Sequence, residues 1–585
     1  MKKPNSVLVA CITVLFLYLS TGSASAQTLS QLNQMRVKLP NGWSLTSVGE
    51  QLPLGDLPLN MAVSHDKKLV AVTNNGQSTQ SIELFDTRTH RRLDSVPIAK
   101  SWYGLAFDDQ DRYLYASGGN DNWIVQYKID GGKLTQMDKY VLGKPWPHPI
   151  SPEGLAVDSK GGYLYVVTKF DTCLYVVSIR DKRILHKIRL SAVPYSCLLS
   201  ANREQLYISL WGGRKVLVYN TSRARVTGQI PVGSHPNELC LSRNGRYLYV
   251  ANADDNSVSV ISTRKLRVVE TLNAALYPNA PSGSTSNGVA ISEDGKTLYI
   301  ANADNNCLAV FDISRPEKSK SLGFIPVGWY PTNVKVVGDD IYVTNGKGLH
   351  SMANPQGPNP ARKGQPVVYQ AGDTTPHKVP VQYIAGLFKG TLSIIKVPSP
   401  SQLTVYSEAV YQNTPYTKKK ETASDIPAGN PIPAKVGGSS PIRHVFYIIK
   451  ENRSYDQVLG DVANGNGDTS LVLFGKHITP NQHKLTQEFV LFDNFYVDAE
   501  VSMDGHNWSM GAYANDYLEK TWPSSYGGRG GYYSGEGRRE MGNNKNGFIW
   551  NDCARNHVSF RTYGEFMKNQ TPSLAVLAGH QAHYR

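Results

Sequence analysis

The chain has 585 residues, of which 40% are hydrophobic and 18% are charged, a composition that excludes a wholly disordered protein. Its length predicts about two to four domains. Lys and Arg outnumber Asp and Glu by 61 to 47, so the formal net charge is +14. This charge favours anionic partners without choosing among phosphate esters, nucleic acids and acidic surfaces.

Residues 1–26 have the pattern of a secretory signal peptide. Lys2 and Lys3 precede an apolar run over residues 7–19, and small residues over 24–26 form a cleavage pattern. The run is too short to span a bilayer comfortably, although an uncleaved membrane anchor is the alternative interpretation. No other stretch has the composition of a transmembrane segment. We therefore expect a secreted or periplasmic protein without a transmembrane anchor.

A repeated unit dominates residues 45–411. Each copy has a small apolar strand, a turn rich in Asp, Asn and Gly, and a second strand that reads Leu-Tyr-Val or similar. Four short strands in a unit of about 45 residues match the strand number and length of a propeller blade. The second strand occurs seven times, beginning at Leu69, Leu114, Leu164, Leu206, Leu248, Leu298 and Ile341. We therefore predict an all-β seven-bladed propeller.

The last predicted blade contains an insertion. Residues 347–385 are rich in Pro, Gly and Asn, which indicates a long loop rather than a domain boundary. Because a propeller closes as a ring, we expect the blade to resume with a strand over residues 391–397.

Two blades carry a family signature. The sequences Tyr249-Val250-Ala251-Asn252 and Tyr342-Val343-Thr344-Asn345 resemble the repeat of the YVTN family of β-propellers. The resemblance covers residues 45–410 and implies the fold, but a propeller fold does not state a function.

The propeller offers two weak binding signals. Scattered Lys and Arg side chains on turns are typical of a solvated surface, so we do not expect nucleic acid as a partner, while a protein partner on the propeller stays open. Four tryptophans either line one end of the ring or pack at blade edges, and we expect the second for Trp102, Trp146, Trp211 and Trp329.

A different domain follows a polar, Pro-rich linker over residues 412–441. In residues 442–585, the apolar runs 444–449 and 489–496 predict strands buried on both faces of a sheet, and residues 503–520 predict a helix. Polar residues that directly follow such a strand stand where open α/β sheets bind ligands.

Ser502 lies at the predicted junction between the second strand and the helix. Backbone N–H groups and the helix dipole stabilise an anion at such a position. A nucleophile that attacks phosphorus benefits from this placement, because negative charge builds there.

The segment Glu451-Asn452-Arg453-Ser454-Tyr455-Asp456 resembles the opening motif of the bacterial phosphoesterase family, which includes phospholipase C-type and acid phosphatase-type enzymes. This family belongs to the alkaline phosphatase superfamily. Residues 479–485 and 492–496 are similar to the superfamily segment that leads to the nucleophile. The resemblance covers residues 441–585, so we expect an α/β domain.

The resemblance implies a metal-dependent hydrolase acting on the ester bonds of a phosphate-ester substrate. It assigns Ser502 as the nucleophile and Glu451 or Asn452 as a ligand of a divalent metal ion. The polar residues Asp504 and His506 lie nearby in the sequence, and we expect them to be support or surface rather than ligands. The competing interpretations are a strand-end carboxylate for Glu451 and a helix N-cap for Ser502.

The later ligands of the superfamily have no counterpart after Ser502. No Asp-Asp or Asp-His pair follows it, and His557, His580 and His583 lack a neighbouring carboxylate in a matching motif. We therefore expect a partial, C-terminally truncated alkaline phosphatase-like domain. The alternative hypothesis is a non-catalytic propeller that binds a ligand, a protein or nucleic acid and carries a remnant phosphoesterase domain.

Overall fold

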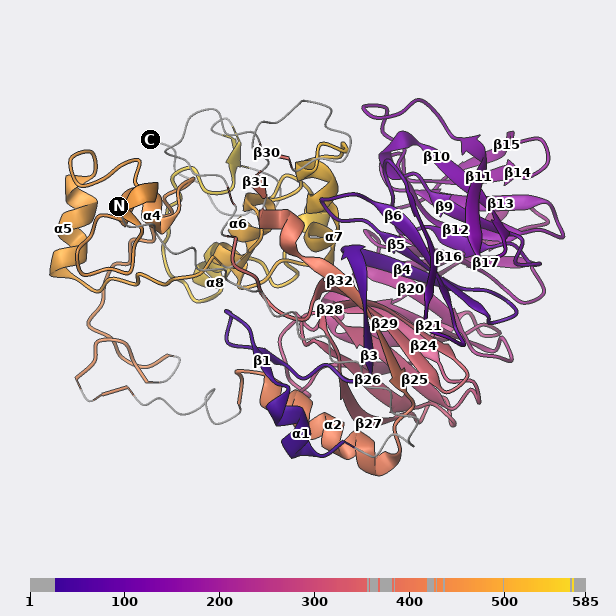
Figure 1. Cartoon of the computed structure of the whole chain (residues 1–585), viewed down its shortest axis with the longest axis horizontal. Coiled ribbons are helices and arrows are strands. Elements are labelled where there is room, and N and C mark those ends of the chain that lie inside the picture. The colour runs from indigo at the N-terminus through magenta and orange to yellow at the C-terminus, as the bar shows by residue number, and fades with distance from the viewer. Residues whose placement is uncertain are drawn as a thin grey trace, which may run out of the picture.

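Seven four-stranded antiparallel sheets form a closed ring in the computed structural model (Figure 1). The described residues are 27–354, 357, 367–368, 381–382, 384–417, 426–427, 429–434, 437–497, 499–568 and 571–572. The predicted signal peptide, most of the predicted insertion, His580 and His583 lie outside them.

The blades follow one another along the chain. The first has β4 (Pro58–Val63), β5 (Leu69–Asn74), β6 (Ser81–Asp86) and β7 (Arg92–Pro97), and the second has β8 (Leu105–Phe107), β9 (Tyr113–Ser117), β10 (Trp123–Asp130) and β11 (Lys133–Val141). The third has β12 (Pro152–Asp158), β13 (Tyr163–Thr168), β14 (Cys173–Ser178) and β15 (Ile184–Arg189), and the fourth has β16 (Cys197–Leu199), β17 (Gln205–Leu210), β18 (Lys215–Asn220) and β19 (Arg225–Pro231). The fifth has β20 (Pro236–Leu241), β21 (Tyr247–Asn252), β22 (Ser257–Ser262) and β23 (Arg267–Asn273), and the sixth has β24 (Ser286–Ile291), β25 (Thr297–Asn302), β26 (Cys307–Asp312) and β27 (Lys320–Pro326). All seven copies of the repeated segment lie in the second strand of a blade, so the prediction of a seven-bladed propeller is confirmed.

The seventh blade joins the two ends of the propeller sequence. Its strands are β28 (Trp329–Val337), β29 (Asp340–Gly348), β32 (Lys389–Lys396) and the N-terminal β3 (Glu50–Asp56). β32 corresponds to the strand expected over 391–397, and β3 pairs with it antiparallel, placing Leu52 opposite Leu392. The ring is therefore closed by hydrogen bonds between its first and last strands.

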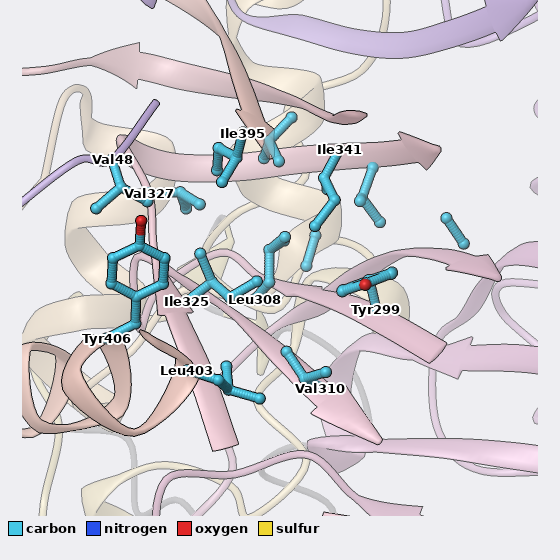
Figure 2. Close-up of a cluster of buried hydrophobic side chains, with 14 of the residues drawn as sticks. Val48, Tyr299, Leu308, Val310, Ile325, Val327, Ile341, Ile395, Leu403 and Tyr406 are labelled. Carbon is cyan, nitrogen blue, oxygen red and sulfur yellow. The ribbon is translucent and has the colours of Figure 1, made fainter. Parts of the chain in front are cut away.

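Apolar side chains fill the space between neighbouring blades. Figure 2 shows one such cluster, in which Leu308 of blade six and Ile341 and Ile395 of blade seven meet Leu403 and Tyr406. The last two belong to α2 (Pro400–Asn413), which packs on β27 and beside α1 (Leu29–Gln34). Period-two alternation along each strand supplies these side chains to both faces of a blade.

Short elements complete the propeller region. They are β1 (Val37–Lys38), β2 (Ser44–Leu45), the parallel pair β30 (Val367–Val368) and β31 (Val381–Gln382), and the 3-10 turns η1 (Gly119–Asp121), η2 (Ala253–Asp255) and η3 (Ile384–Leu387).

The C-terminal region is mainly helical in its described part. It contains α4 (Tyr455–Leu459), η4 (Thr469–Leu471), α5 (Pro480–Glu488), α6 (Ser502–Gly511), α7 (Asp516–Tyr526), η5 (Glu540–Gly542), α8 (Ile549–Arg555), and the hairpin of β33 (Met567–Lys568) and β34 (Thr571–Pro572). Within the described residues, no helix is long and apolar enough to cross a bilayer.

Two predicted strands are not formed. Residues 444–449 and 489–496 have no strand assignment, and their apolar side chains face solvent, with Phe446 88% and Phe495 79% exposed. A strand buried on both faces requires flanking strands, and the described residues supply none to either run. The helix predicted over 503–520 is divided into α6 and α7 at Ala512, whose φ is 62°. An alkaline phosphatase-like α/β fold is therefore not formed by the described residues.

Candidate functional site

Helix α7 docks on one end of the propeller ring (Figure 1). Every residue from Asp516 to Pro523 is buried. Tyr517, Leu518 and Trp522 share an apolar cluster with the propeller residues Leu57, Trp102, Tyr103, Tyr195 and Trp211. Most of these propeller residues lie just before the first strand of a blade. Because the first strands of all blades begin at the same end of the ring, these residues gather at that end.

The expected packing of the tryptophans at blade edges is wrong for three of the four. Trp102 and Trp211 belong to the cluster beneath α7, and Trp146 contacts Tyr532 of the C-terminal region with ring centres 4.9 Å apart. Trp329 instead packs on Phe388. The first three tryptophans therefore line one end of the ring, where the C-terminal region covers them.

Buried charges hold α7 in place. The Asp516 carboxylate accepts a hydrogen bond from Trp211 Nε1 at 3.0 Å, lies 2.7 Å from His235 Nδ1, and receives Lys520 Nζ at 2.9 Å. Burial opposes ionisation of Asp516, but the charges of Lys520 and His235 prevail and lower its pKa to about 2. The Lys520 ammonium also lies 4.6 Å from the centre of the Tyr195 ring. The interface is thus a compensated ionic network set among aromatic rings.

Ser502 is the first residue of α6, so the structure places it at the N-terminus of a helix, as the sequence predicts. The N-cap position belongs to Val501, which removes the interpretation of Ser502 as the cap. Asp504 supports this helix end, because its carboxylate oxygens accept the backbone N–H groups of Glu500 and Val501 at 3.2 and 3.0 Å. Ser502 is half-buried at this position.

Glu451 is brought to α6 from 51 positions before the first residue of that helix. Its Oε1 lies 3.5 Å from His506 Nε2, and Glu536 Oε1 lies 3.7 Å from the same nitrogen. On the other side of the ring, Nδ1 lies 2.8 Å from Glu565 Oε1. The hydrogen bond to Glu565 and the nearby carboxylates raise the pKa of His506 to about 9, so the imidazole is a cation at neutral pH. Asn452, the other predicted ligand, is exposed.

Asp504 belongs to a second, buried group of carboxylates. One ligand oxygen each from Glu500, Asp504 and Glu519 lies within 4.8 Å of the others. Lys347 of β29 forms ion pairs with Glu500 and with Glu519, the second at 3.2 Å. Burial and the neighbouring carboxylates raise the pKa of Asp504 well above its usual range and that of Glu519 to about 8. Burial also acts on Glu500, but the Lys347 charge keeps its pKa below the usual value.

Sequence analysis missed Glu500, Glu519, Glu536 and Glu565. Glu519 lies on a different helix from Asp504, and Glu536 and Glu565 lie 30 or more positions beyond His506. No local motif connects Glu519, Glu536 and Glu565 to α6, because the turn between α6 and α7 and the loops after α7 create the proximity. Glu500 lies only four positions before Asp504, so its place beside the start of α6 could have been found from the sequence.

The donor atoms around Glu451 are of the chemical type that binds a divalent cation. The carboxylates of Glu451 and Glu536 lie near one imidazole nitrogen, so two anionic oxygen donors are present beside His506. Carboxylate and amide oxygens are the donors that hard divalent cations prefer. Glu451, with its 48% exposed side chain, and the adjacent Asn452 are also accessible to a substrate from solvent.

Comparison with known proteins identifies the propeller. A family model described as a YNCE-like beta-propeller matches residues 16–339. The chain is 24% identical to antigen Lp49 of Leptospira interrogans over 29% of its own length and 38% of that protein. It is 26% identical to the uncharacterized protein YncE of Salmonella typhimurium over 25% of its length and 40% of that protein.

Two further proteins are similar to the chain over part of its length. The 6-phosphogluconolactonase of Erwinia tasmaniensis is 24% identical over 25% of this chain and 46% of that protein. The matches therefore span less than half the length of each of these three curated relatives. Among solved structures, hydrazine synthase of Kuenenia stuttgartiensis aligns with 17% identity and a TM-score of 0.42, covering 51% of this chain and 94% of that chain.

Proposed function

The chain belongs to the YNCE-like β-propeller family. We propose that its C-terminal region, which follows the propeller, contains a metal-dependent phosphoesterase site. The proposal rests on one observation: Glu451 of the phosphoesterase-like motif reaches the helix that Ser502 begins. The ion pair between Glu451 and His506 joins these two parts of the sequence.

Ser502 is proposed as the nucleophile. Its position at the start of the ten-residue helix α6 places the developing negative charge of a phosphoryl group near the positive end of the helix dipole. Asp504 fixes this end of the helix through the backbone N–H groups of Glu500 and Val501. Its role is therefore to position Ser502.

A divalent ion held by Glu451, with Asn452 beside it, would polarise the phosphoryl oxygen and favour ionisation of the serine hydroxyl. His506, fixed by Glu565, orients the Glu451 carboxylate through their ion pair. The propeller, whose end is closed by α7, supplies a rigid base for these groups. The net charge of +14 favours the approach of anionic phosphate esters.

Hydrolysis of aryl phosphate mono- and diesters by the chain from residue 27 onward tests the proposal, with magnesium, calcium, manganese and zinc supplied separately. We expect turnover with at least one metal, and a fall of about 10³-fold or more in kcat for Ser502→Ala. Ser509→Ala, seven positions further along the same helix, is the matched control and should keep its activity. Equal rates for Ser502→Ala and the unmodified chain, or no turnover with any metal, would reject the phosphoesterase.

A non-catalytic binding protein is the second candidate function. It is favoured by the exposed apolar side chains of Val445, Phe446 and Ile448, which are 83%, 88% and 75% exposed and offer surface to a partner. If the folded chain shows no turnover and the Ser502→Ala variant folds as the unmodified chain does, the result supports the binding protein over the phosphoesterase.

A further inference from the structure

The carboxylates of Glu500, Asp504 and Glu519 form a group distinct from Glu451. They come from the residue before the N-cap of α6, the first turn of α6 and the first turn of α7, and their nearest ligand oxygens lie within 4.8 Å of one another. The side chains are 9%, 0% and 3% exposed, respectively. Lys347 connects the group to blade seven of the propeller.

Full ionisation of this group would leave its charges unbalanced. Three ionised carboxylates and the Lys347 ammonium would give a formal charge of −2 in the interior. Burying uncompensated charge is strongly unfavourable, so either protons or a cation must complete the balance. One divalent cation makes the sum zero.

An unsatisfied polar atom within the group is a second sign of a ligand. Glu519 Oε1 has no hydrogen-bond partner within the described part of the chain, although the residue is only 3% exposed. A bound cation would give this oxygen an electropositive partner.

We propose that Glu500, Asp504 and Glu519 bind one calcium ion, which fastens α6 and α7 to the seventh blade. Ca²⁺–oxygen distances of about 2.3–2.6 Å place opposite donors about 4.6–5.2 Å apart, which accommodates the observed limit of 4.8 Å. Magnesium, at about 2.0–2.1 Å, requires a tighter set of donors and keeps several of its waters, which a buried site disfavours.

Calcium binding to the full chain from residue 27 onward tests this proposal. After treatment with a chelator and dialysis, the protein is titrated with calcium chloride by calorimetry, and thermal unfolding is followed with and without calcium. We expect one tight equivalent of calcium and a higher midpoint of unfolding in its presence. Glu519→Gln should weaken calcium binding about tenfold or more and remove the shift in the midpoint.

Two control variants separate this site from other carboxylates. Glu153→Gln changes a carboxylate that is 0% exposed at the same end of the ring, where Lys169 balances it, and should leave calcium binding unchanged. Glu451→Gln should lose the proposed hydrolysis yet keep the calcium equivalent. The phosphoesterase proposal and the calcium proposal can therefore be rejected independently of each other.

The outcome that rejects the site is equal calcium affinity in the unmodified chain and in Glu519→Gln, or no effect of calcium on unfolding. If Glu519→Gln does not fold, Lys347→Met gives an independent test. Removing the ammonium makes the cluster more negative, so calcium affinity should rise, and an unchanged affinity would also reject the proposal.

Discussion

The propeller and the C-terminal region differ in where their apolar segments find partners. In each of the first six blades, every strand pairs with its neighbour in the sequence, as β5 does with β4 and β6. In the C-terminal region, the runs 444–449 and 489–496 have comparable apolar composition but no strand partner within the described residues. The strands of the first six blades therefore have partners close in sequence, which these two apolar runs lack.

The two regions also differ in how they are held. Blades adhere through apolar clusters such as that of Leu308, Ile341 and Ile395. The C-terminal region is attached to the ring through α7, where Asp516, Lys520 and His235 are buried as charges. Substitutions at this attachment should therefore have larger effects than comparable truncations within a blade.

The largest effect is expected for Asp516→Ala. The variant leaves Lys520 buried without its carboxylate partner and removes the acceptor of Trp211 Nε1, so the free energy of unfolding should fall by about 3–5 kcal/mol. Urea unfolding measures this change. Asp552→Ala, which breaks the exposed ion pair with Arg555 on α8, is the control and should change stability by less than about 1 kcal/mol. Equal effects of the two variants would contradict a buried ionic attachment.

A matched pair of isoleucines compares the two regions directly. Ile300 in β25 is 0% exposed, and Ile300→Ala should lower the free energy of unfolding by about 2–5 kcal/mol through loss of packing and a cavity. Ile448 is 75% exposed, and Ile448→Ala should change it by less than about 0.5 kcal/mol. Denaturant unfolding measures both. A large loss for Ile448→Ala would mean that residues 444–449 are buried in solution.

The smallest effect concerns pH and His506. Because its pKa is raised from 6.5 to about 9 by Glu565 and the nearby carboxylates, its contribution to stability is complete below about pH 6.5 and is lost as the pH rises through 9. Partial solvent screening limits this contribution to about 1–2 kcal/mol. Thermal unfolding of the unmodified chain and of His506→Gln between pH 6 and 10 measures it. The difference between the two proteins should shrink as pH rises, and a constant difference would contradict the ion-pair account.

The sequence by itself determined most of the propeller. The seven repeated segments located the second strand of every blade, since period-two alternation and nearby turns are local properties. The sequence also located β32, but its N-terminal partner β3 was beyond such reasoning, because Leu52 and Leu392 are adjacent only after the whole ring forms. In the same way, the sequence located Ser502 at a helix start, a feature set by neighbouring residues.

Only the tertiary structure decided how the polar residues of the C-terminal region are grouped. It joined Glu451 to His506, placed Glu519 beside Asp504, and buried Asp516 against the propeller. It also left residues 444–449 exposed, where their composition predicted a buried strand. The reason is physical: hydrogen-bonded strands and compensated charges depend on partners, and local sequence does not specify a partner that lies far away along the chain.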